Sequence, residues 1–424
     1  MPDIGTAEGA RARRVLLVST NYAPEQAGIG PYAAQTAEHW AADGRTETHV
    51  LAGIPHYPAW RADPAYRGVR RVTEERAGVR VHRRRHTVPS RQTALRRALY
   101  EASILAGGLL APPRTGPLDA VVAQLPSLAG GVLGARIARR HGAPYVPVVQ
   151  DLMGAAAAQS GISGGGRAAG AAAAVERHVL GRATLVGVIH ETFADKVAAL
   201  GVDPDRIRLV PNWSHVARPS RTRAETRARL GWSEDRTVVL HSGNMGLKQG
   251  LEVLVEAARA EPGVDLVLMG DGNQRERLRE LGAGLPNLVF LPPADDEDFT
   301  DVLAAADVLA VTQRASVLDM SIPSKLTSYF AAGRPVVASV AEEGGTAGEV
   351  RRSGAGVLVP PEDPGALLAA VRKLAEDPAA AQALGARGPA YVDAHLSREA
   401  GLKRITALLD EALETHARQR GTRT

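Results

Sequence analysis

The chain has 424 residues, of which 45% are apolar, and this length predicts two domains of roughly 200 residues each. It contains no cysteine, which excludes disulfides, thiolate metal sites and thiol catalysis and suits a cytoplasmic protein. No apolar stretch reaches the roughly 18 residues of a membrane-spanning helix, and the N-terminus lacks the apolar segment of a signal peptide.

The net charge of +5 is unevenly distributed along the chain. Residues 1–212 hold 26 Lys and Arg against 17 Asp and Glu, whereas the remainder holds 25 against 29. Residues 67–97 alone contain eleven arginines and two glutamates. This stretch is either a solvated basic face or a surface that attracts an anionic membrane or a phosphorylated ligand. Nucleic acid is not expected as a partner, because no aromatic residues interleave with these arginines.

The N-terminal half alternates apolar runs, predicted as strands, with segments of helical periodicity. Val15–Thr20 is the first strand, and a helix from Pro31 to about Ala42 follows it, with proline at the first helical position. Helices at Ala129–His141 and Glu191–Leu200 separate later strands. Those strands are predicted at His49–Ala52, Val79–His82, Ala120–Ala123, Tyr145–Val149, Leu185–Ile189 and Ile207–Val210. The alternation predicts a parallel, doubly wound α/β domain.

Residues 91–113 lie within the basic part of this domain. They combine Arg91, Arg96 and Arg97 with apolar residues at helical spacing. The apolar positions are Leu95, Leu99, Ile104, Leu105, Leu109 and Leu110. This pattern predicts an amphipathic helix that meets an anionic surface.

A second alternating series follows Asn212. Its strands are predicted at Thr237–His241, Asp265–Met269, Leu288–Leu291, Val308–Val311, Val336–Ser339 and Gly356–Val359. Helices at Asp298–Ala306 and Pro364–Glu376 join some of them. The predicted division is therefore a domain over residues 1–212, a second over residues 213–396, and a C-terminal helix in residues 397–424 that packs across their junction.

A glycine loop in residues 238–259 follows a β-branched run and opens a helix. It contains three glycines and Lys248, one of only five lysines beside 46 arginines. Backbone N–H groups at such a helix start attract an anion, most often a phosphate. The alternative is a tight connection that uses glycine only for positive φ and close packing.

Three further loops repeat this theme. Gly28 and Gly30 lie between the first strand and the first helix. In the segment IPSKLTSYFAAGRPVVAS, Ser324 is a plausible N-cap, and Lys325 lies in the first turn, where a cation opposes the helix dipole unless it faces an anion. Residues 342–346 form another helix-start loop.

Together these motifs resemble glycosyltransferase family 4, the retaining enzymes of GT-B architecture, over nearly the whole chain. The resemblance rests on the motifs VQDL, VPNW, HSGNMGLKQGLE, PSKL and GRPVVAS. They follow one another along the chain as they do in the enzymes that assemble exopolysaccharides of the colanic-acid type. It implies two Rossmann-like, doubly wound α/β domains facing a central cleft. The N-terminal domain would bind the acceptor, and the C-terminal domain the nucleotide sugar.

The resemblance also implies site residues. Lys248, Lys325 and Asp151 are expected to act in catalysis. Donor-binding positions are Gly28, Gly30, Gly243, Asn244, Gly246, Gly272, Arg314, Ser324, Ser328, Gly345 and Thr346. Gln150, Arg96 and Arg97 are expected on the acceptor side.

Two positions depart from the family pattern. Asn244 stands where many members have a phosphate-binding arginine, so Lys325 or Arg314 would have to supply that charge. The family's paired glutamates would fall at about Met320 and Ser328, and neither is Glu. Because Ser328 can make only one hydrogen bond to the ribose, a weaker clamp on the donor is expected.

No metal ion or other cofactor is expected. The pairs Asp203/Asp205 and Asp296/Asp298 have the spacing of metal ligands, but the first lies in a proline turn and the second at a helix start, where carboxylates favour the dipole. No G-x-G-x-x-G follows a strand, so dinucleotide chemistry is unsupported.

The sequence therefore predicts a retaining, metal-independent glycosyltransferase. Its donor would be a UDP or GDP sugar, and its hydroxyl acceptor a lipid-linked glycan or a small natural product. Peripheral contact with the inner face of the membrane is one expectation for a cytoplasmic enzyme of this kind. Two alternatives stay open: a nucleotide-sugar epimerase, for which no acid/base carboxylate pair is identifiable, and a non-catalytic protein that binds sugar nucleotides.

Overall fold

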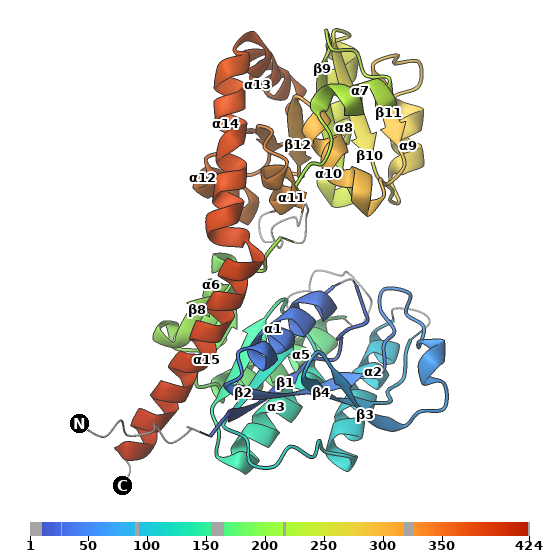
Figure 1. The fold of residues 1–424 in the computed structure, drawn as a ribbon. Coiled ribbons are helices and arrows are strands. Elements are labelled where there is room, and N and C mark those ends of the chain that lie inside the picture. Colours follow the sequence, from blue (N-terminus) through green and yellow to red (C-terminus); the bar gives the residue numbers. More distant parts are fainter. Residues whose placement is uncertain are drawn as a thin grey trace, which may run out of the picture. The chain divides into compact units, whose positions relative to one another are not determined.

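The computed structural model describes residues 11–26, 28–89, 93–153, 165–214, 218–317 and 325–422. The chain divides into two compact units (Figure 1). The first, here the N-terminal unit, comprises Met1–Asn212 and Leu402–Thr424. The second, the C-terminal unit, is Trp213–Gly401.

The described residues of the N-terminal unit form an eight-stranded sheet in the order β3-β4-β2-β1-β5-β6-β7-β8. The strands are β1 Arg13–Val18, β2 Thr46–Gly53, β3 Arg71–Arg76, β4 Val79–Arg84, β5 Ala120–Leu125, β6 Tyr145–Val149, β7 Val186–Val188 and β8 Ile207–Leu209. The helices are α1 Gly30–Ala42, α2 Ala94–Leu110, α3 Leu128–His141, α5 Gly165–Gly181 and α6 Glu191–Ala199, with short 3₁₀ turns η1 Pro64–Tyr66 and η2 Pro204–Arg206.

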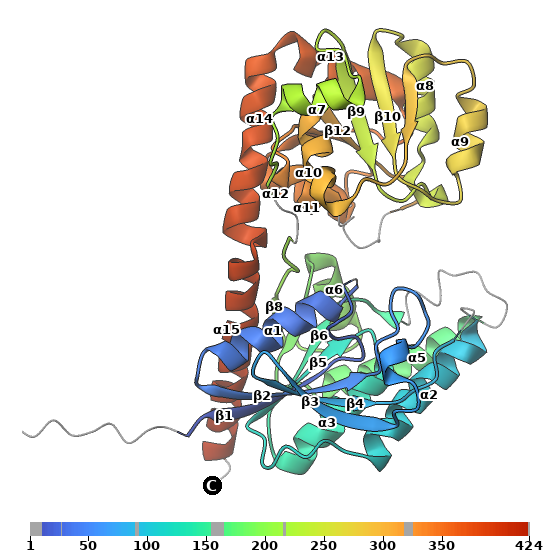
Figure 2. The same cartoon turned by 45° about the vertical axis from the view of Figure 1, so that its right-hand side comes forward.

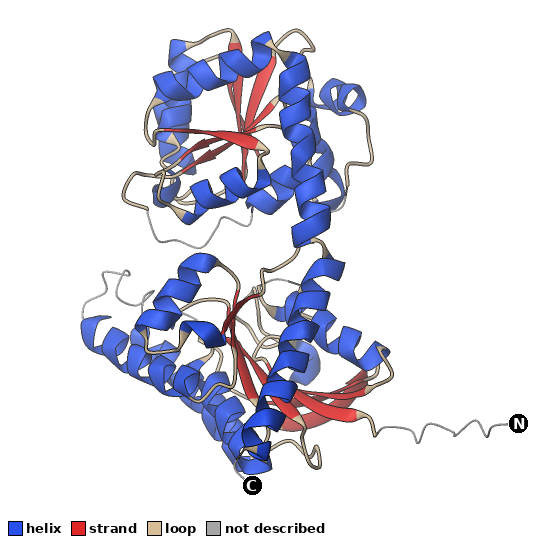
Figure 3. Ribbon diagram, turned by 90° about the vertical axis from the view of Figure 1, so that its left-hand side faces the viewer, coloured by secondary structure: helices blue, strands red, loops and turns tan. Residues whose placement is uncertain are grey.

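Strand β1 shows why this sheet is doubly covered. Its run Val15–Val18 is buried on both faces. Val15 and Leu17 join a core cluster with Trp40 of α1, whereas Leu16 and Val18 join another that includes α3 and α5 residues. Helices on both faces of the sheet account for a continuous apolar run in place of an alternating one. The predicted doubly wound parallel sheet is confirmed (Figure 3).

Strand β3 is the exception, because it pairs antiparallel with β4. Its sequence RVTEER is largely exposed, so no apolar run marks it as a strand. The hairpin turn is made by Ala77 and Gly78, both with positive φ. A solvated edge of this kind is invisible to hydrophobic periodicity.

The last helix, α15 Arg398–Gly421, contributes to the N-terminal unit from Leu402 onward. Leu408, Leu409 and Ala412 join the core cluster of α1. Trp40 donates its indole N–H to Thr406 Oγ1 at 3.0 Å.

The described residues of the C-terminal unit form a six-stranded, all-parallel sheet in the order β11-β10-β9-β12-β13-β14 (Figure 2). The strands are β9 Thr237–Ser242, β10 Val264–Met269, β11 Leu288–Leu291, β12 Val308–Thr312, β13 Val336–Ser339 and β14 Gly356–Val359. The helices are α7 Arg223–Leu230, α8 Glu252–Ala260, α9 Arg275–Leu281, α10 Asp296–Ala305, α11 Lys325–Ala331, α12 Gly345–Ser353, α13 Pro364–Glu376 and α14 Pro378–Tyr391, with η3 Leu247–Gln249 and the π-turn η4 Val392–Leu396.

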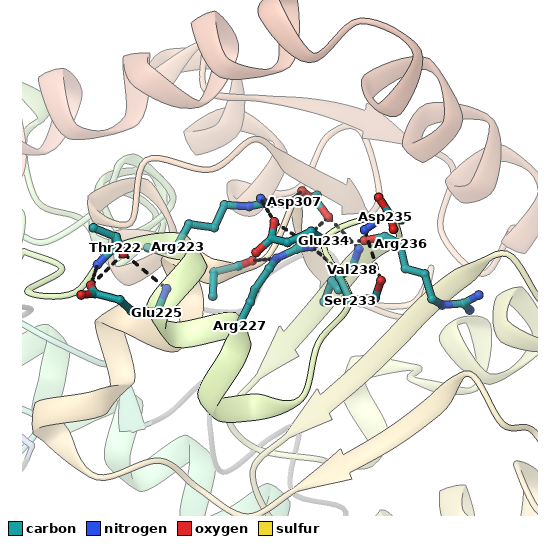
Figure 4. Close-up of polar contacts among 12 residues, drawn as sticks. Thr222, Arg223, Glu225, Arg227, Ser233, Glu234, Asp235, Arg236, Val238 and Asp307 are labelled. Carbon is teal, nitrogen blue, oxygen red and sulfur yellow. Dashed lines mark hydrogen bonds and ion pairs between the residues drawn. The ribbon is translucent and has the colours of Figure 1, made fainter.

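A buried arginine joins α7 to this sheet. The Arg227 side chain is fully buried, and its Nη2 lies 2.6 Å from Asp307 Oδ2 (Figure 4). The same carboxylate accepts a hydrogen bond from the Val238 N–H at 2.8 Å. The Arg227 guanidinium also donates to the carbonyl oxygens of Ser233 and Ala305. Arg227 thus satisfies several buried acceptors at the start of β9.

Candidate active site

Two loops at the carboxyl edge of the C-terminal sheet pack tightly against each other. Gly243, after β9, donates its N–H to the Met269 carbonyl oxygen at 2.8 Å. A Cβ on Gly270 would lie 2.0 Å from the Gly243 oxygen, and one on Gly272 would lie 2.5 Å from the Met245 oxygen. Both glycines also have strongly positive φ, so only glycine fits there. The predicted donor loop therefore has a defined backbone shape.

Lys325 lies beside this loop, at the first position of α11. Its Nζ is 3.7 Å from the position a Cβ on Gly243 would take. Its Nζ also lies 3.2 Å from Nε2 of the fully buried His241. Burial and the adjacent ammonium keep His241 neutral. Since His241 Nδ1 lies 3.3 Å from the Ala310 carbonyl oxygen, we assign the proton to Nδ1, which leaves Nε2 to accept from the ammonium.

The electrostatics of this pair have one main cause. Burial lowers the pKa of Lys325 to about 8. Burial, and then the Lys325 charge, lower the pKa of His241 well below its usual range. Among the described residues, no carboxylate lies within ion-pair distance of Lys325. An anion bound at the loop would meet a cation that no described acidic side chain neutralises.

Lys248 is exposed on η3 of the same loop. Arg314 fixes this turn, since its backbone N–H donates to the Lys248 oxygen at 3.0 Å and its Nε to the Leu247 oxygen at 2.7 Å. The Arg314 guanidinium also forms ion pairs with Glu252 and Glu362. The Arg314 guanidinium is therefore matched by two carboxylates, and its contacts hold the turn that carries Lys248.

Other positions predicted to bind the donor lie in the same loop and at the start of α12. Asn244 is exposed and Gly246 half-buried within the same loop. Gly345 and Thr346 form the first turn of α12, whose N-cap Gly344 has no side-chain capping bond from any described residue. The helix start after β13 therefore keeps its partial positive charge. The strands β9, β12 and β13, which lead to the Gly243 loop, α11 and α12, are neighbours in the sheet, so these three features share its carboxyl edge.

Of the two positions predicted for the family's glutamate pair, Met320 and Ser328, the structure describes only Ser328. Ser328 is buried on α11. Ser324 and Met320 lie outside the described residues.

In the N-terminal unit, Gly28 has φ +66° and precedes α1. A Cβ there would lie 3.0 Å from a ring carbon of Tyr57. Gly30 is the first residue of α1, and the N-cap Ile29 has no side-chain capping bond from the described part of the chain. Glu25 holds the neighbouring loop in place by accepting the Tyr57 N–H at 2.8 Å. The Glu25 carboxylate also lies at this helix start, with Oε2 3.6 Å from the position of a Cβ on Gly30, so a bound anion would meet a negative charge beside the backbone N–H groups.

Gln150 and Asp151 lie at the end of β6. Gln150 is held between two amides, with its Nε2 3.2 Å from Gln124 Oε1 and its Oε1 2.6 Å from Asn212 Nδ2. Burial raises the pKa of Asp151, against smaller opposing effects of Lys196 and Arg97. The chain segments VQDL and VPNW are thus joined by a direct side-chain hydrogen bond.

Arg96 and Arg97 point in different directions from α2. Arg96 is exposed. The Arg97 guanidinium carbon lies 5.6 Å from the Trp60 ring centroid and 5.3 Å from that of Tyr100. Tyr57 packs edge-on against Trp60. Sequence reasoning missed this aromatic group, although two of its members, Tyr57 and Trp60, are close neighbours in a chain with only 4% aromatic residues.

One aspartate of each predicted pair has a structural partner. Asp203 accepts the Asp205 N–H at 3.0 Å, which caps η2. Asp298 forms ion pairs with Arg229 and Arg221, which lower its pKa to about 2. Within the described ranges, no group of three or more His, Asp and Glu side chains is arranged to hold a metal ion.

Comparison with known proteins follows the same two-unit division. Residues 27–213 match the family described as glycosyl transferase 4-like domain, and residues 222–391 match glycosyl transferases group 1. A protein named as the colanic acid biosynthesis glycosyl transferase WcaI, from Escherichia coli (strain K12), is 32% identical over 377 residues. That match covers 85% of this chain and 91% of the relative.

Two solved structures share the fold over almost the full length. Sucrose-phosphate synthase from Thermosynechococcus elongatus has a TM-score of 0.68 at 22% identity, covering 94% of this chain and 98% of the other. Anabaena HepE in complex with UDP-glucose has a TM-score of 0.62 at 18% identity, covering 94% and 99%. The motifs, the two α/β units and these matches agree: the chain belongs to the family 4 glycosyltransferases of GT-B fold and is a transferase enzyme.

Proposed function

We propose that this enzyme transfers a sugar from a nucleoside diphosphate sugar to a hydroxyl acceptor, with retention of configuration and without a metal ion. The observation that carries the proposal is the Lys325 ammonium, half-buried beside the Gly243 loop and in contact with a neutral histidine. Burial of a cation is unfavourable unless an opposite charge joins it. A donor diphosphate would supply that charge.

The enzyme must stabilise the negative charge that grows on the leaving diphosphate as the glycosidic bond breaks. Lys325, Lys248 and the start of α12 are fixed positive groups at one edge of the sheet. Fixed groups of this kind stabilise a transition state without reorganising when the bond breaks. They can replace the divalent ion that other transferases use at this point.

Retention requires the new bond to form on the face that the diphosphate leaves. The bond from the anomeric carbon to the diphosphate oxygen breaks, and the acceptor oxygen bonds to the same carbon from the same side. The acceptor proton passes to the departing diphosphate oxygen, so no carboxylate nucleophile is needed. We assign Asp151 and Gln150 to hydrogen bonds with the reacting sugar, because Gln150 is already oriented by two amides.

The relatives support a glycan or glycolipid product. WcaI is named for colanic acid biosynthesis, and HepE has been solved with UDP-glucose. We therefore propose a UDP or GDP sugar as the donor and a lipid-linked glycan as the first acceptor to test, with a small natural product as the second.

The test is incubation with a panel of UDP- and GDP-sugars and candidate acceptors, read by mass spectrometry and by release of nucleoside diphosphate. One donor should give both diphosphate and a glycosylated acceptor. An epimerised sugar without diphosphate would identify an epimerase. Binding without turnover across the panel would identify a non-catalytic protein, the outcome that Ser328 in place of glutamate makes worth testing.

A further inference from the structure

Helix α2 is apolar on the face that meets solvent. Leu95 is 72% exposed, Leu99 55%, Leu109 45% and Leu110 86%. Eight large hydrophobic residues are exposed in the described part of the chain, and these four are all on this one helix of 17 residues. A surface helix normally turns its polar side to water, so the apolar outer face of α2 is unusual.

The core side of α2 is already occupied. Tyr100 is 3% exposed, and Ile104 and Leu105 pack against a core cluster of the N-terminal unit. Ser103 donates toward the Tyr100 oxygen and also accepts the Thr87 N–H, which ties this side to the chain after β4. The outward leucines are therefore additional to a complete inner face.

Helical geometry places the outward residues in one line. At about 100° per residue, positions 95, 99, 102, 106 and 109 fall on a single side of the helix. The whole helix is roughly 25 Å long. Exposed alanines fill the places between the leucines. We call this face the α2 stripe; it comprises Leu95, Leu99, Ala102, Ala106, Leu109 and Leu110.

The chain segment that contains α2 carries mainly positive charge. Residues 79–140 contain eleven arginines and only Glu101 and Asp119 as acids. Glu101 is turned inward, where it accepts the Ala129 N–H at 2.9 Å. Arg85 and Arg96 are exposed. The Arg85 carbonyl oxygen lies 3.3 Å from the position of a Cβ on Gly107, so Arg85 flanks the helix.

We infer that the α2 stripe docks on an anionic lipid bilayer, with the leucines in the acyl boundary and the flanking arginines at the lipid phosphates. An apolar line bordered by arginine is the pattern of an interfacial helix. No membrane-spanning helix is found in the described part of the chain, so such contact would be peripheral. A protein partner of ordinary surface chemistry would not require a border of only positive charge.

Docking would also serve the reaction, a point that rests on the proposed function. The side of α2 opposite the stripe carries Arg97, which stacks on Trp60 and Tyr100. One helix would then hold the bilayer on its outer side and present a cation to a lipid-linked phosphate on its inner side. Bilayer binding itself can be measured without turnover.

Co-sedimentation of the full chain with vesicles tests the inference. Wild-type protein should bind phosphatidylcholine vesicles that contain phosphatidylglycerol, should bind pure phosphatidylcholine weakly, and should dissociate as NaCl is raised. The double variant Leu95→Ser/Leu99→Ser should lose about tenfold or more in vesicle affinity, because it removes apolar area from the contact. Leu209→Ser/Leu281→Ser is the matched control, with leucines 44% and 40% exposed outside α2, and should bind as wild type does.

Charge is tested in the same assay. Arg85→Gln/Arg96→Gln should lower binding to anionic vesicles, whereas Arg398→Gln/Arg420→Gln, which changes the same charge at exposed positions elsewhere, should not. If the wild-type protein does not bind anionic vesicles, that result alone overturns the inference, and no variant is needed. A dimer by light scattering that Leu95→Ser/Leu99→Ser abolishes, with no vesicle binding, would assign the stripe to self-association.

Failure of docking and failure of the proposed function are distinguishable. Transfer to a water-soluble acceptor with no vesicle binding would remove the docking surface and leave the transferase. Vesicle binding without transfer to any acceptor would keep the docking surface and remove the proposed transferase function.

Discussion

Both units match arginines with carboxylates, and they differ in the cations that neutral groups hold. In the C-terminal unit, arginines such as Arg227, Arg236 and Arg314 are matched with carboxylates. In the N-terminal unit, Arg14 pairs with Glu47 and Arg83 with Glu74. Arg84 instead donates to the backbone carbonyl oxygens of Ala111 and Arg83, and Arg97 packs on aromatic rings. One cation of the C-terminal unit that a neutral group contacts is Lys325, beside His241. An arginine with a carboxylate partner holds the fold, whereas a cation held by neutral groups keeps its attraction for an anion. This contrast indicates where ligands bind in each unit.

The largest effect is expected where a matched cation is removed from the interior. Arg227→Met should destabilise the C-terminal unit by about 3 kcal/mol, since it leaves buried acceptors and Asp307 without their donor. The measurement is the midpoint of the urea transition. Arg229→Met is the control, because Arg229 is half exposed at the surface and its loss should hardly move the midpoint. Equal shifts of the urea midpoint in both variants would contradict the claim that the buried pair contributes more to stability than the surface pair.

Lys248 should behave in the opposite way. Lys248→Ala is expected to leave the unfolding midpoint unchanged and to lower turnover by roughly 10² or more, because a fixed charge near the leaving group acts mainly in the transition state. Steady-state kinetics with the identified donor measure this, with Lys373→Ala as an exposed-lysine control in the same unit. Wild-type turnover in Lys248→Ala would remove Lys248 from the mechanism.

A smaller effect concerns pH. Burial lowers the Lys325 pKa to about 8. The amine is therefore protonated and charged below that pH and neutral above it. The kcat/KM for the donor should therefore fall as pH rises through about 8. Lys325→Arg should move this limb upward, since a guanidinium stays protonated. For stability the sign is reversed: the unfolded lysine binds more protons between about 8 and its usual pKa, so this group makes the unit more stable as pH rises there.

The smallest expected effect is that of metal removal. Activity should survive EDTA, because every anion-stabilising group proposed here belongs to the protein. Loss of turnover on chelation, restored by Mn²⁺ or Mg²⁺, would contradict the metal-independent mechanism.

Much of the fold could be predicted because buried parallel strands are continuous apolar runs, and β6, β11, β13 and β14 begin and end where those runs do. The site was only partly predictable. Lys325 is recognisable as a lysine that opposes a helix dipole, but its contact with His241, 84 residues away, depends on the crossover from β12 to α11. The same limit applies to α2. Its leucine spacing predicts an amphipathic helix, yet only packing shows that Ile104 and Leu105 face the core while Leu95 and Leu99 face solvent.

The central claim is that the half-buried Lys325 is the charge that receives the donor diphosphate. Its most direct test is turnover of Lys325→Gln against the matched Lys373→Gln, with the donor that the panel identifies. The account predicts a loss of roughly 10² or more in kcat for Lys325→Gln, an unfolding midpoint no lower than wild type, and unchanged kinetics for Lys373→Gln. Wild-type kcat in a folded Lys325→Gln enzyme would contradict it.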